Sequence, residues 1–173
     1  MRAKPDVVLM DLRMPGVDGI TAIEHIGKLA SPPVMVVLTT FDADQYVLRA
    51  LRAGASGFLV KSTRPEDLIG LVRVAAEGHT VLSPAAARRL IAASADSQPA
   101  KDKARKLVSQ LTERETEVLA CLGEGLSNAQ IAGRLYLSEA TVKGYVSRML
   151  DKLGLANRTQ AGLLAHEADL VQR

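Results

Sequence analysis

Residues 138–153 read SEATVKGYVSRMLDKL, and their apolar side chains recur at the spacing of one face of a helix. That apolar stripe consists of Val142, Val146, Met149, Leu150 and Leu153. The opposite face is small, polar or basic apart from one acid, and it carries Lys143, Gly144, Ser147, Arg148 and Asp151. We therefore predict a helix that packs on one side and can enter a DNA groove with the other. A solvated helix face would show similar charges, so the pattern alone leaves both interpretations open.

A capping box predicts where an earlier helix begins. In Thr112-Glu113-Arg114-Glu115 the threonine hydroxyl can accept from a free backbone N–H, while the Glu115 carboxylate can reach back to the Thr112 N–H. The helix should end near Gly123 or Gly125, because glycine adopts the left-handed conformation that closes a helix at little cost.

A second capping box, Ser127 to Gln130, opens a short helix. Tyr136 and Leu137 should form a turn, after which Ser138 caps the helix of residues 138–153. This order predicts a helix-turn-helix whose second helix is the recognition helix. A fourth helix should follow Asn157, and it either closes the small core or pairs two copies of the chain.

Residues 111–161 resemble the DNA-binding domain of LuxR-type regulators along their whole length, in the caps, the turn, the apolar stripe and the TVK tripeptide at 141–143. The resemblance implies that the positive end of the recognition helix and its basic side chains meet phosphates of double-stranded DNA. Lys143, Gly144 and Ser147 are expected nearest the base edges. The full set of expected DNA-binding residues is Ser127, Asn128, Thr141, Lys143, Gly144, Ser147 and Arg148.

The chain has 173 residues, 47% of them hydrophobic and 24% charged, which is typical of a soluble globular protein of one or two small domains. The longest apolar run, Val34 to Leu38, is too short to span a bilayer, and no stretch resembles a signal peptide. We therefore expect a cytoplasmic protein without a membrane partner. The single cysteine, Cys121, lies on the apolar side of its helix and is expected in the core rather than in redox chemistry.

The formal net charge of +3 is spread almost evenly along the chain and is a weak argument for nucleic acid. Phosphate binding must therefore depend on the local placement of charges. The basic residues of the recognition region are Lys143, Arg148, Lys152 and Arg158, set against Glu139 and Asp151.

Short apolar strands alternate with helices in the first half of the chain, which predicts a parallel α/β sheet. The predicted strands are Val7–Met10, Val34–Leu38 and Gly57–Val60. The predicted helices are one capped by Asp18 with Ile20, Ile23, Ile26 and Leu29 on one face, one over Asp42–Arg52 closed by Gly54, and one over Thr63–Glu77.

Asp11, Thr39 and Lys61 follow these three strands, and the sites of parallel sheets form at the carboxyl ends of the strands. A carboxylate, a hydroxyl and an ammonium group suit phosphoryl capture, in which the carboxylate attacks and the other two hold the transferred oxygens. Each residue alone also has a plain alternative, namely strand-end solubility, a turn cap and a surface cation.

Together with the segments DLRMPGVDG, VVLTTFD and AGASGFLVKS, these residues resemble the receiver domain of response regulators. The resemblance implies that Asp11 accepts phosphate from a sensor histidine kinase, and that the Arg13 carbonyl joins Asp11 in holding Mg²⁺. It further implies that Thr39 moves toward the phosphoryl group, with Phe58 as the coupled aromatic switch and Lys61 as the ion-pair partner. A receiver followed by a LuxR-type domain is similar to the NarL/FixJ family.

The chain begins at what resembles the end of a receiver's second helix, so the acidic Mg²⁺-binding pair of the family's first strand has no counterpart in it. We therefore expect Asp11 to be phosphorylated poorly or not at all. Val7–Met10 would be an open apolar edge, so we expect the partial receiver to self-associate or to be marginally stable. Either the chain is a fragment of a longer protein, which we favour, or another chain covers this edge.

The predicted fold is α/β plus all-α. A partial flavodoxin-like receiver with a parallel sheet occupies residues 1–80, and a four-helix LuxR-type helix-turn-helix domain occupies residues 109–173. Residues 81–108 form the linker, with a helix at 84–93 that leads into a polar tether at 94–106. The predicted function is a DNA-binding, homodimeric transcriptional regulator of a two-component phosphorelay, not an enzyme. The alternative is an interaction module that dimerises with full-length regulators and inhibits them.

Overall fold

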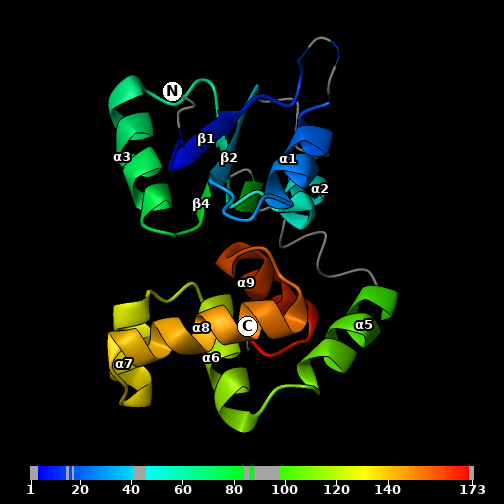
Figure 1. Ribbon diagram of the computed structural model, residues 1–173, viewed down its shortest axis with the longest axis vertical. Helices are drawn as coiled ribbons and strands as arrows, with labels where there is room; N and C mark the ends of the chain where they lie inside the picture. Colours follow the sequence, from blue (N-terminus) through cyan, green and yellow to red (C-terminus); the bar gives the residue numbers. More distant parts are fainter. Residues whose placement is uncertain are drawn as a thin grey trace. The chain divides into compact units, whose positions relative to one another are not determined.

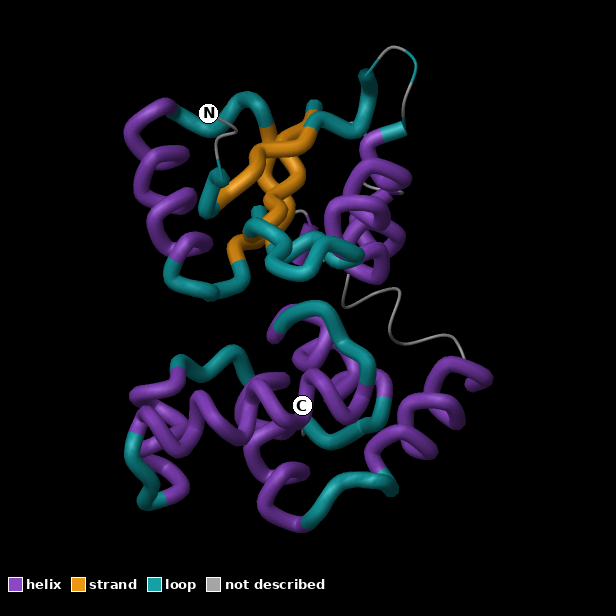
Figure 2. The backbone as a smooth tube through the Cα atoms, in the orientation of Figure 1, coloured by secondary structure: helices purple, strands orange, loops and turns teal. Residues whose placement is uncertain are grey.

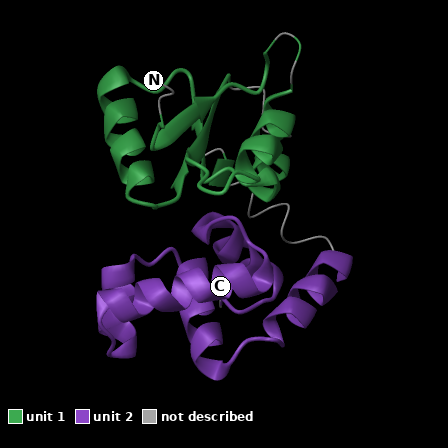
Figure 3. Cartoon of the chain, in the orientation of Figure 1, with its two compact units in different colours: residues 1–93 green, residues 94–173 purple. Residues whose placement is uncertain are grey.

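The chain folds as two compact units, residues 1–93 and 94–173, which Figure 3 distinguishes by colour. The computed structural model describes residues 4–14, 16, 18–40, 46–83, 86–87 and 98–171. Separate clusters of buried apolar side chains lie in the two units.

Unit 1 is a parallel sheet with helices on both faces (Figure 1). Among the described residues the sheet has four strands in the order β1-β2-β3-β4, namely Val7–Met10, Val34–Thr39, Gly57–Val60 and Val81–Leu82. Its helices are α1 (Gly19–Gly27), α2 (Val47–Ala53) and α3 (Pro65–Ala76). The parallel pairing follows from the strand and helix alternation, since each helix carries the chain back to the start of the next strand.

The two faces of the sheet bury different apolar clusters. One cluster brings Ile23 of α1, Leu51 of α2 and Phe58 of β3 together. The other brings Val36 of β2 and Ala75 of α3 together. Strands covered on both faces are apolar at nearly every position, which is why β1, β2 and β3 are recognisable as continuous apolar runs.

The three predicted strands are confirmed, and β2 extends one residue further, to Thr39. Asp18 caps α1 as predicted, because its carboxylate accepts a hydrogen bond from the Ile20 N–H at 3.4 Å. Gly54 ends α2 at φ +116°, a conformation that glycine adopts without steric cost.

Three details differ from the prediction. Leu29 was expected on the inner face of the first helix, but α1 ends at Gly27 and Leu29 is 56% exposed, so the helical spacing no longer applies to it. Strand β4 was not predicted, because two residues carry no periodicity. Helix α2 begins at Val47, and residues 42–45 of the helix predicted from Asp42 lie outside the described part of the chain.

In its described residues, unit 2 consists of helices joined by loops (Figure 2). Its helices are α5 (Gln98–Val108), α6 (Glu113–Gly123), α7 (Asn128–Leu135), α8 (Glu139–Leu153) and α9 (Arg158–Glu167). None of the helices in the described residues of either unit has both the length and the apolar character required to cross a membrane.

Both predicted capping boxes are confirmed. The Thr112 hydroxyl accepts from the Glu115 N–H at 3.3 Å, and the Glu115 carboxylate accepts from the Thr112 N–H at 2.8 Å. Ser127 and Gln130 make the same pair of bonds, at 3.2 and 2.8 Å. Tyr136 ends α7 in the left-handed region at φ +54°, which turns the chain toward α8.

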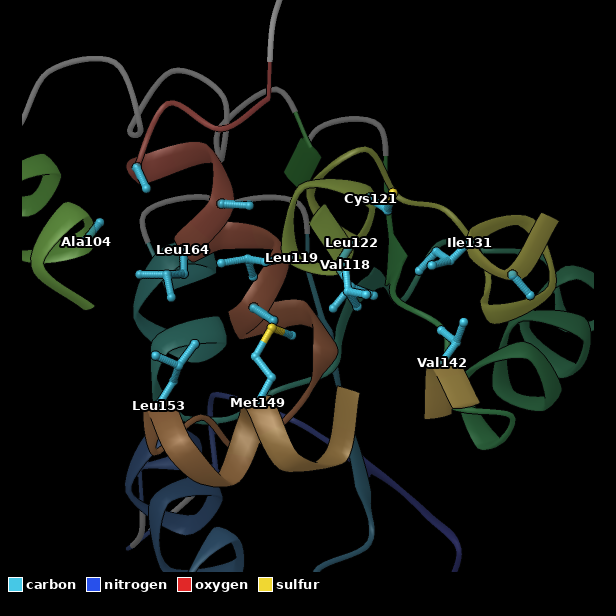
Figure 4. Packing of buried hydrophobic residues seen from close by; sticks show 14 residues of the cluster. Ala104, Val118, Leu119, Cys121, Leu122, Ile131, Val142, Met149, Leu153 and Leu164 are labelled. Carbon is cyan, nitrogen blue, oxygen red and sulfur yellow. The ribbon is translucent and has the colours of Figure 1, made fainter. Parts of the chain in front are cut away.

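The core of unit 2 is formed by side chains from all its described helices, most of which Figure 4 labels. Its largest fully buried side chains are Val118, Leu119, Ile131, Val142 and Met149. Cys121 is also buried there, and this burial raises the pKa of its thiol, which agrees with the predicted core role.

Helix α9 closes this core. Ala161, Leu164 and Ala165 are buried in it, and α9 lies so close to α6 that a Cβ on Gly123 would stand 2.7 Å from the Ala165 Cβ. Of the two roles expected for the fourth helix, core closure is therefore observed, while pairing between two copies stays a prediction.

The tether predicted at 94–106 instead contains most of α5, which packs on α9. Ala104 is 1% exposed in the core of unit 2, and Lys101 and Arg105 bind the Asp169 carboxylate at 3.2 and 2.7 Å. The second compact unit therefore includes α5 and spans residues 94–173, whereas the DNA-binding domain was predicted from residue 109. The tether prediction followed from the polar composition of α5, which does not reveal that one small apolar side chain anchors it. Most of the helix predicted at 84–93 lies outside the described residues.

We predict that Asp169→Asn loosens α5 from α9 and leaves the rest of unit 2 folded. In the parent chain, Lys101 and Arg105 hold the pKa of the Asp169 carboxyl below its usual range. The asparagine amide of the variant lacks the negative charge that these two cations bind. Hydrogen exchange of the α5 amides should become faster while that of the α6 amides stays unchanged. Asp151→Asn, which alters an exposed acid of α8, is the matched control, and unchanged exchange in α5 would contradict the prediction.

Candidate functional sites

The carboxyl ends of β1, β2 and β3 bring three of the predicted residues of unit 1 to one edge of the sheet. Asp11 follows β1, and its Oδ2 forms an ion pair with the Lys61 ammonium group, which follows β3. The other carboxylate oxygen of Asp11 accepts from the Arg13 N–H at 3.1 Å. The Lys61 N–H donates to the Thr39 carbonyl at 2.7 Å, so the loop after β3 is fixed to the end of β2.

The position of Asp11 is also set by α1. A Cβ on Gly19, the first residue of α1, would lie 2.8 Å from the Leu12 Cα and closer still to the Asp11 carbonyl oxygen. Only a glycine permits this approach, so the loop that carries Asp11 lies directly against the beginning of α1.

Electrostatics keep Asp11 ionised. The hydrogen bond from Lys61, and after it the Arg13 N–H, lower the pKa of the Asp11 carboxyl, because both stabilise the charged form. A carboxylate that stays ionised and partly exposed keeps its lone pairs available to an incoming electrophile.

Thr39 and Phe58 are buried beside this edge. Thr39 is 1% exposed, and its Oγ1 has no hydrogen-bond partner among the described residues. A buried hydroxyl without a partner is costly. Phe58 is 2% exposed and belongs to the cluster under α1 and α2.

In unit 2 the predicted recognition helix α8 has the two faces expected of it. Val142, Met149 and Leu153 are buried, whereas Thr141, Lys143, Ser147 and Arg148 are exposed and Gly144 is partly exposed. The Ser138 hydroxyl caps the helix by accepting from the Thr141 N–H at 3.1 Å. The exposed face and the amino-terminal end of α8 therefore lie next to each other on the surface of unit 2.

Two of the basic residues expected to meet phosphates are instead bound within the protein. Lys152 pairs with Glu115 of α6 at 2.9 Å, and Arg158 donates to the Leu126 carbonyl at 2.5 Å. Burial lowers the pKa of Arg158, which is consistent with a guanidinium group directed into the unit. Both interactions join segments distant in sequence, which is why the charge pattern did not reveal them.

Lys143 and Arg148 differ from these residues. Neither side chain forms an ion pair with any acid of the described chain, and both are exposed on α8. The Arg148 guanidinium lies over the ring of Tyr145, with Cζ 5.1 Å from the ring centroid. Sequence reasoning did not select Tyr145, although an aromatic residue three positions before an arginine on a helix is a recognisable signal.

Ser127 and Asn128, which were expected at the DNA, form the beginning of α7. The Ser127 hydroxyl is occupied by its capping bond to the Gln130 N–H. The Asn128 Oδ1 is buried and has no partner among the described residues.

A parallel sheet with an ionised carboxylate at its edge, joined to a helical unit with a capped recognition helix, defines a receiver coupled to a helix-turn-helix domain. The sequence pattern of the family described as "Response regulator receiver domain" matches residues 1–73, and that of "Bacterial regulatory proteins, luxR family" matches residues 109–165. The chain belongs to the NarL/FixJ family of two-component response regulators.

Its relatives are transcriptional regulators. The uncharacterized transcriptional regulatory protein YxjL of Bacillus subtilis is 40% identical over 171 residues, which cover 99% of this chain and 78% of YxjL. The transcriptional activator DevR/DosR of Mycobacterium tuberculosis is 38% identical, over 95% of this chain and 74% of that protein. The nitrate/nitrite response regulator NarL of Escherichia coli is 36% identical, over 94% of this chain and 74% of NarL. A crystal structure of the response regulator ChrA aligns with a TM-score of 0.44 at 37% identity, over 96% of this chain and 77% of ChrA.

The protein is therefore a response regulator in which a receiver is followed by a LuxR-type DNA-binding domain, the composition of a two-component transcriptional regulator. The relatives are regulators and not enzymes. No comparison supports the alternative of an inhibitory interaction module.

Receivers of this family typically use Mg²⁺. The donors at the sheet edge are the Asp11 carboxylate, which Lys61 and Arg13 already engage, and the expected Arg13 carbonyl. In the described residues, no three histidine, cysteine or acidic side chains are grouped so that they could hold a metal ion. This donor set supplies only two of the six oxygen ligands that Mg²⁺ prefers.

We predict that Lys61→Met raises the pKa of Asp11 toward the ordinary carboxyl value of about 3.9. In the parent chain the folded-state pKa of Asp11 is lowered, so the ion pair with Lys61 stabilises the fold at pH values above the unfolded-state pKa. That stability is lost as the pH falls through the folded-state pKa. Carboxyl chemical shifts followed by NMR titration measure the change. Arg64→Met, which removes a nearby cation that pairs with Asp67, should leave Asp11 unchanged, and an unshifted Asp11 in Lys61→Met would contradict the assignment.

Proposed function

We propose that α8 reads DNA through the part of its surface that centres on Gly144, with Lys143 and Ser147 nearest the base edges. The observation that carries this proposal is the contrast among basic side chains: Lys143 and Arg148 have no acidic partner in the described chain, whereas Lys152 is paired inside the unit. Cations without internal partners on the exposed face of a recognition helix are available to phosphates and to guanine.

The beginnings of two helices complete the proposed surface. Ser127 and Asn128 stand at the amino-terminal end of α7, and Thr141 lies in the first turn of α8. Backbone N–H groups and the helix dipole favour phosphate at such ends. These contacts would set the position of the protein on the duplex, while the exposed side chains of α8 select the sequence.

Selection of bound duplexes from a random pool tests the proposal. The full chain, at fixed physiological salt, should enrich one sequence, and an inverted repeat would indicate that it binds as the homodimer we propose. Absence of any enriched sequence would contradict sequence-specific binding. A single enriched half-site would contradict the homodimer but not the proposal that α8 reads the DNA sequence.

Lys143→Ala should weaken binding to the selected duplex by about 1 to 3 kcal/mol, because a lysine that contacts a base loses that contact. Binding to unrelated duplex should change much less. Fluorescence anisotropy with both duplexes measures the difference. Lys103→Ala, which removes an exposed cation from α5, controls for net charge, and an equal loss in the two variants would exclude Lys143 from base reading.

Gly144→Ala should change stability and binding in opposite directions. A Cβ at this position would meet no atom within 4 Å, so the fold does not require glycine here. Alanine inside a helix is favoured over glycine by about 0.5–1 kcal/mol, and the variant should resist denaturant better. If Gly144 lies against the groove, the same methyl group should weaken specific DNA binding. Unchanged affinity in the more stable variant would show that the glycine serves no contact.

We further propose that Asp11 is the phosphoacceptor and that a sensor histidine kinase is the physiological donor. The carboxylate would attack phosphorus as the P–N bond to the kinase's histidine breaks and the imidazole leaves, with the Lys61 ammonium group and the Thr39 hydroxyl near the transferred oxygens. The ion pair of Asp11 with Lys61 and the unpartnered Thr39 hydroxyl support this arrangement. The switch roles of Thr39 and Phe58 are part of the same proposal.

Labelling of the purified chain by a small-molecule phosphodonor tests the acceptor. We expect the label to be labile to hydroxylamine, as an acylphosphate is, and to be lost in Asp11→Asn. Asp6→Asn, which changes the acid just before β1, is the control and should retain whatever label the parent chain acquires. Label that survives Asp11→Asn would place the acceptor elsewhere.

A further inference from the structure

The ring of Tyr145 and the guanidinium of Arg148 form a stacked pair on α8, and nothing in the sequence resemblance assigns a role to the tyrosine. We infer that Tyr145 is a positioning residue that holds Arg148 in the orientation in which it binds DNA. This inference rests on the proposed function, since it concerns the same surface of α8. It adds a residue that touches the arginine and need not touch the nucleic acid.

The ring is a fixed support. Tyr145 is partly buried and packs against the core of unit 2, one helical turn from the buried Val142 and Met149. Helical geometry brings residues three apart onto neighbouring positions, so Arg148 meets the ring without any change of backbone. Its Cζ lies 5.1 Å from the ring centroid, within the range of a cation–π contact.

The stack determines which part of the guanidinium is available. All five N–H donors of arginine lie in the plane of the group, so a guanidinium that packs its face on the ring would keep these donors free at its edge. No acid of the described residues takes up these donors. A long arginine side chain otherwise loses rotamer entropy when it is fixed, and the contact with the ring removes part of that loss before DNA binds.

The chemistry that fits this edge is a pair of acceptor oxygens or nitrogens in one plane. A phosphate group and the O6/N7 edge of guanine both provide it. Loss of a phosphate contact would weaken binding equally on all duplexes and would reduce the salt dependence of binding. A guanine contact would be lost on the selected duplex only, so the two sources are separable in one experiment.

The test is a double-mutant cycle in the full chain, with binding measured on the selected duplex and on unrelated duplex at two salt concentrations. Tyr145→Phe keeps the ring and should bind within about twofold of the parent. Tyr145→Leu keeps an apolar side chain but removes the ring, and it should lose roughly two- to fivefold in affinity. Added to Arg148→Ala, the same change should cost nothing further, because the arginine it positions is gone. Additive losses would overturn the inference.

A second measurement does not depend on any variant or on DNA. In the free chain, a guanidinium over an aromatic ring places the Arg148 side-chain protons in the ring current, so their NMR signals should move upfield. Random-coil shifts for these protons would overturn the inference even if Tyr145→Leu fails to fold. Failure of the parent chain to select a duplex would contradict the proposed function, whereas the ring-current shift tests the stack by itself.

Discussion

Burial of the apolar stripe of α8 fixes the rotation of that helix about its own axis, and the candidate DNA-binding surface depends on it. Val142 and Met149 are wholly buried against the other helices of unit 2, so the opposite face can only point outward. The capping bonds then fix where α6, α7 and α8 begin. Side chains four or five positions apart in the sequence thus acquire definite places on one surface, although none of them contributes to holding the helix in position.

A different constraint brings the site residues of unit 1 together. Parallel strands must all end at the same edge of the sheet, so residues 28 and 22 positions apart, Asp11 to Thr39 and Thr39 to Lys61, meet there. The lysine lowers the pKa of the carboxyl and occupies one of its oxygens, which leaves the carboxylate charged but restrained. The topology brings these groups together, and the ion pair determines their chemical state.

Sequence reasoning succeeded where the decisive interactions are local. The capping boxes at Thr112 and Ser127 join residues three apart, and the β-strands are continuous apolar runs, so both were predictable. It failed where distant segments meet. The pairing of Lys152 with Glu115 spans 37 positions, and α5 looked like a polar tether because only its docking on α9 shows that Ala104 is buried. Tyr145 was overlooked because a partly buried aromatic residue in a core helix is ordinarily explained by packing.

Several basic side chains of unit 2 are bound to other groups of the same unit. This affects how the protein would search a chromosome. Bulk DNA competes for any basic surface, and each free cation strengthens that sequence-independent attraction. Lys152 and Arg158 are already bound to the protein, and Arg134 is paired with Glu124. Few cations then remain to attract the phosphates of DNA of any sequence. Unrelated DNA would therefore bind only a small share of this regulator. More of the molecules present would then remain free to find their operators, even when the chain is scarce.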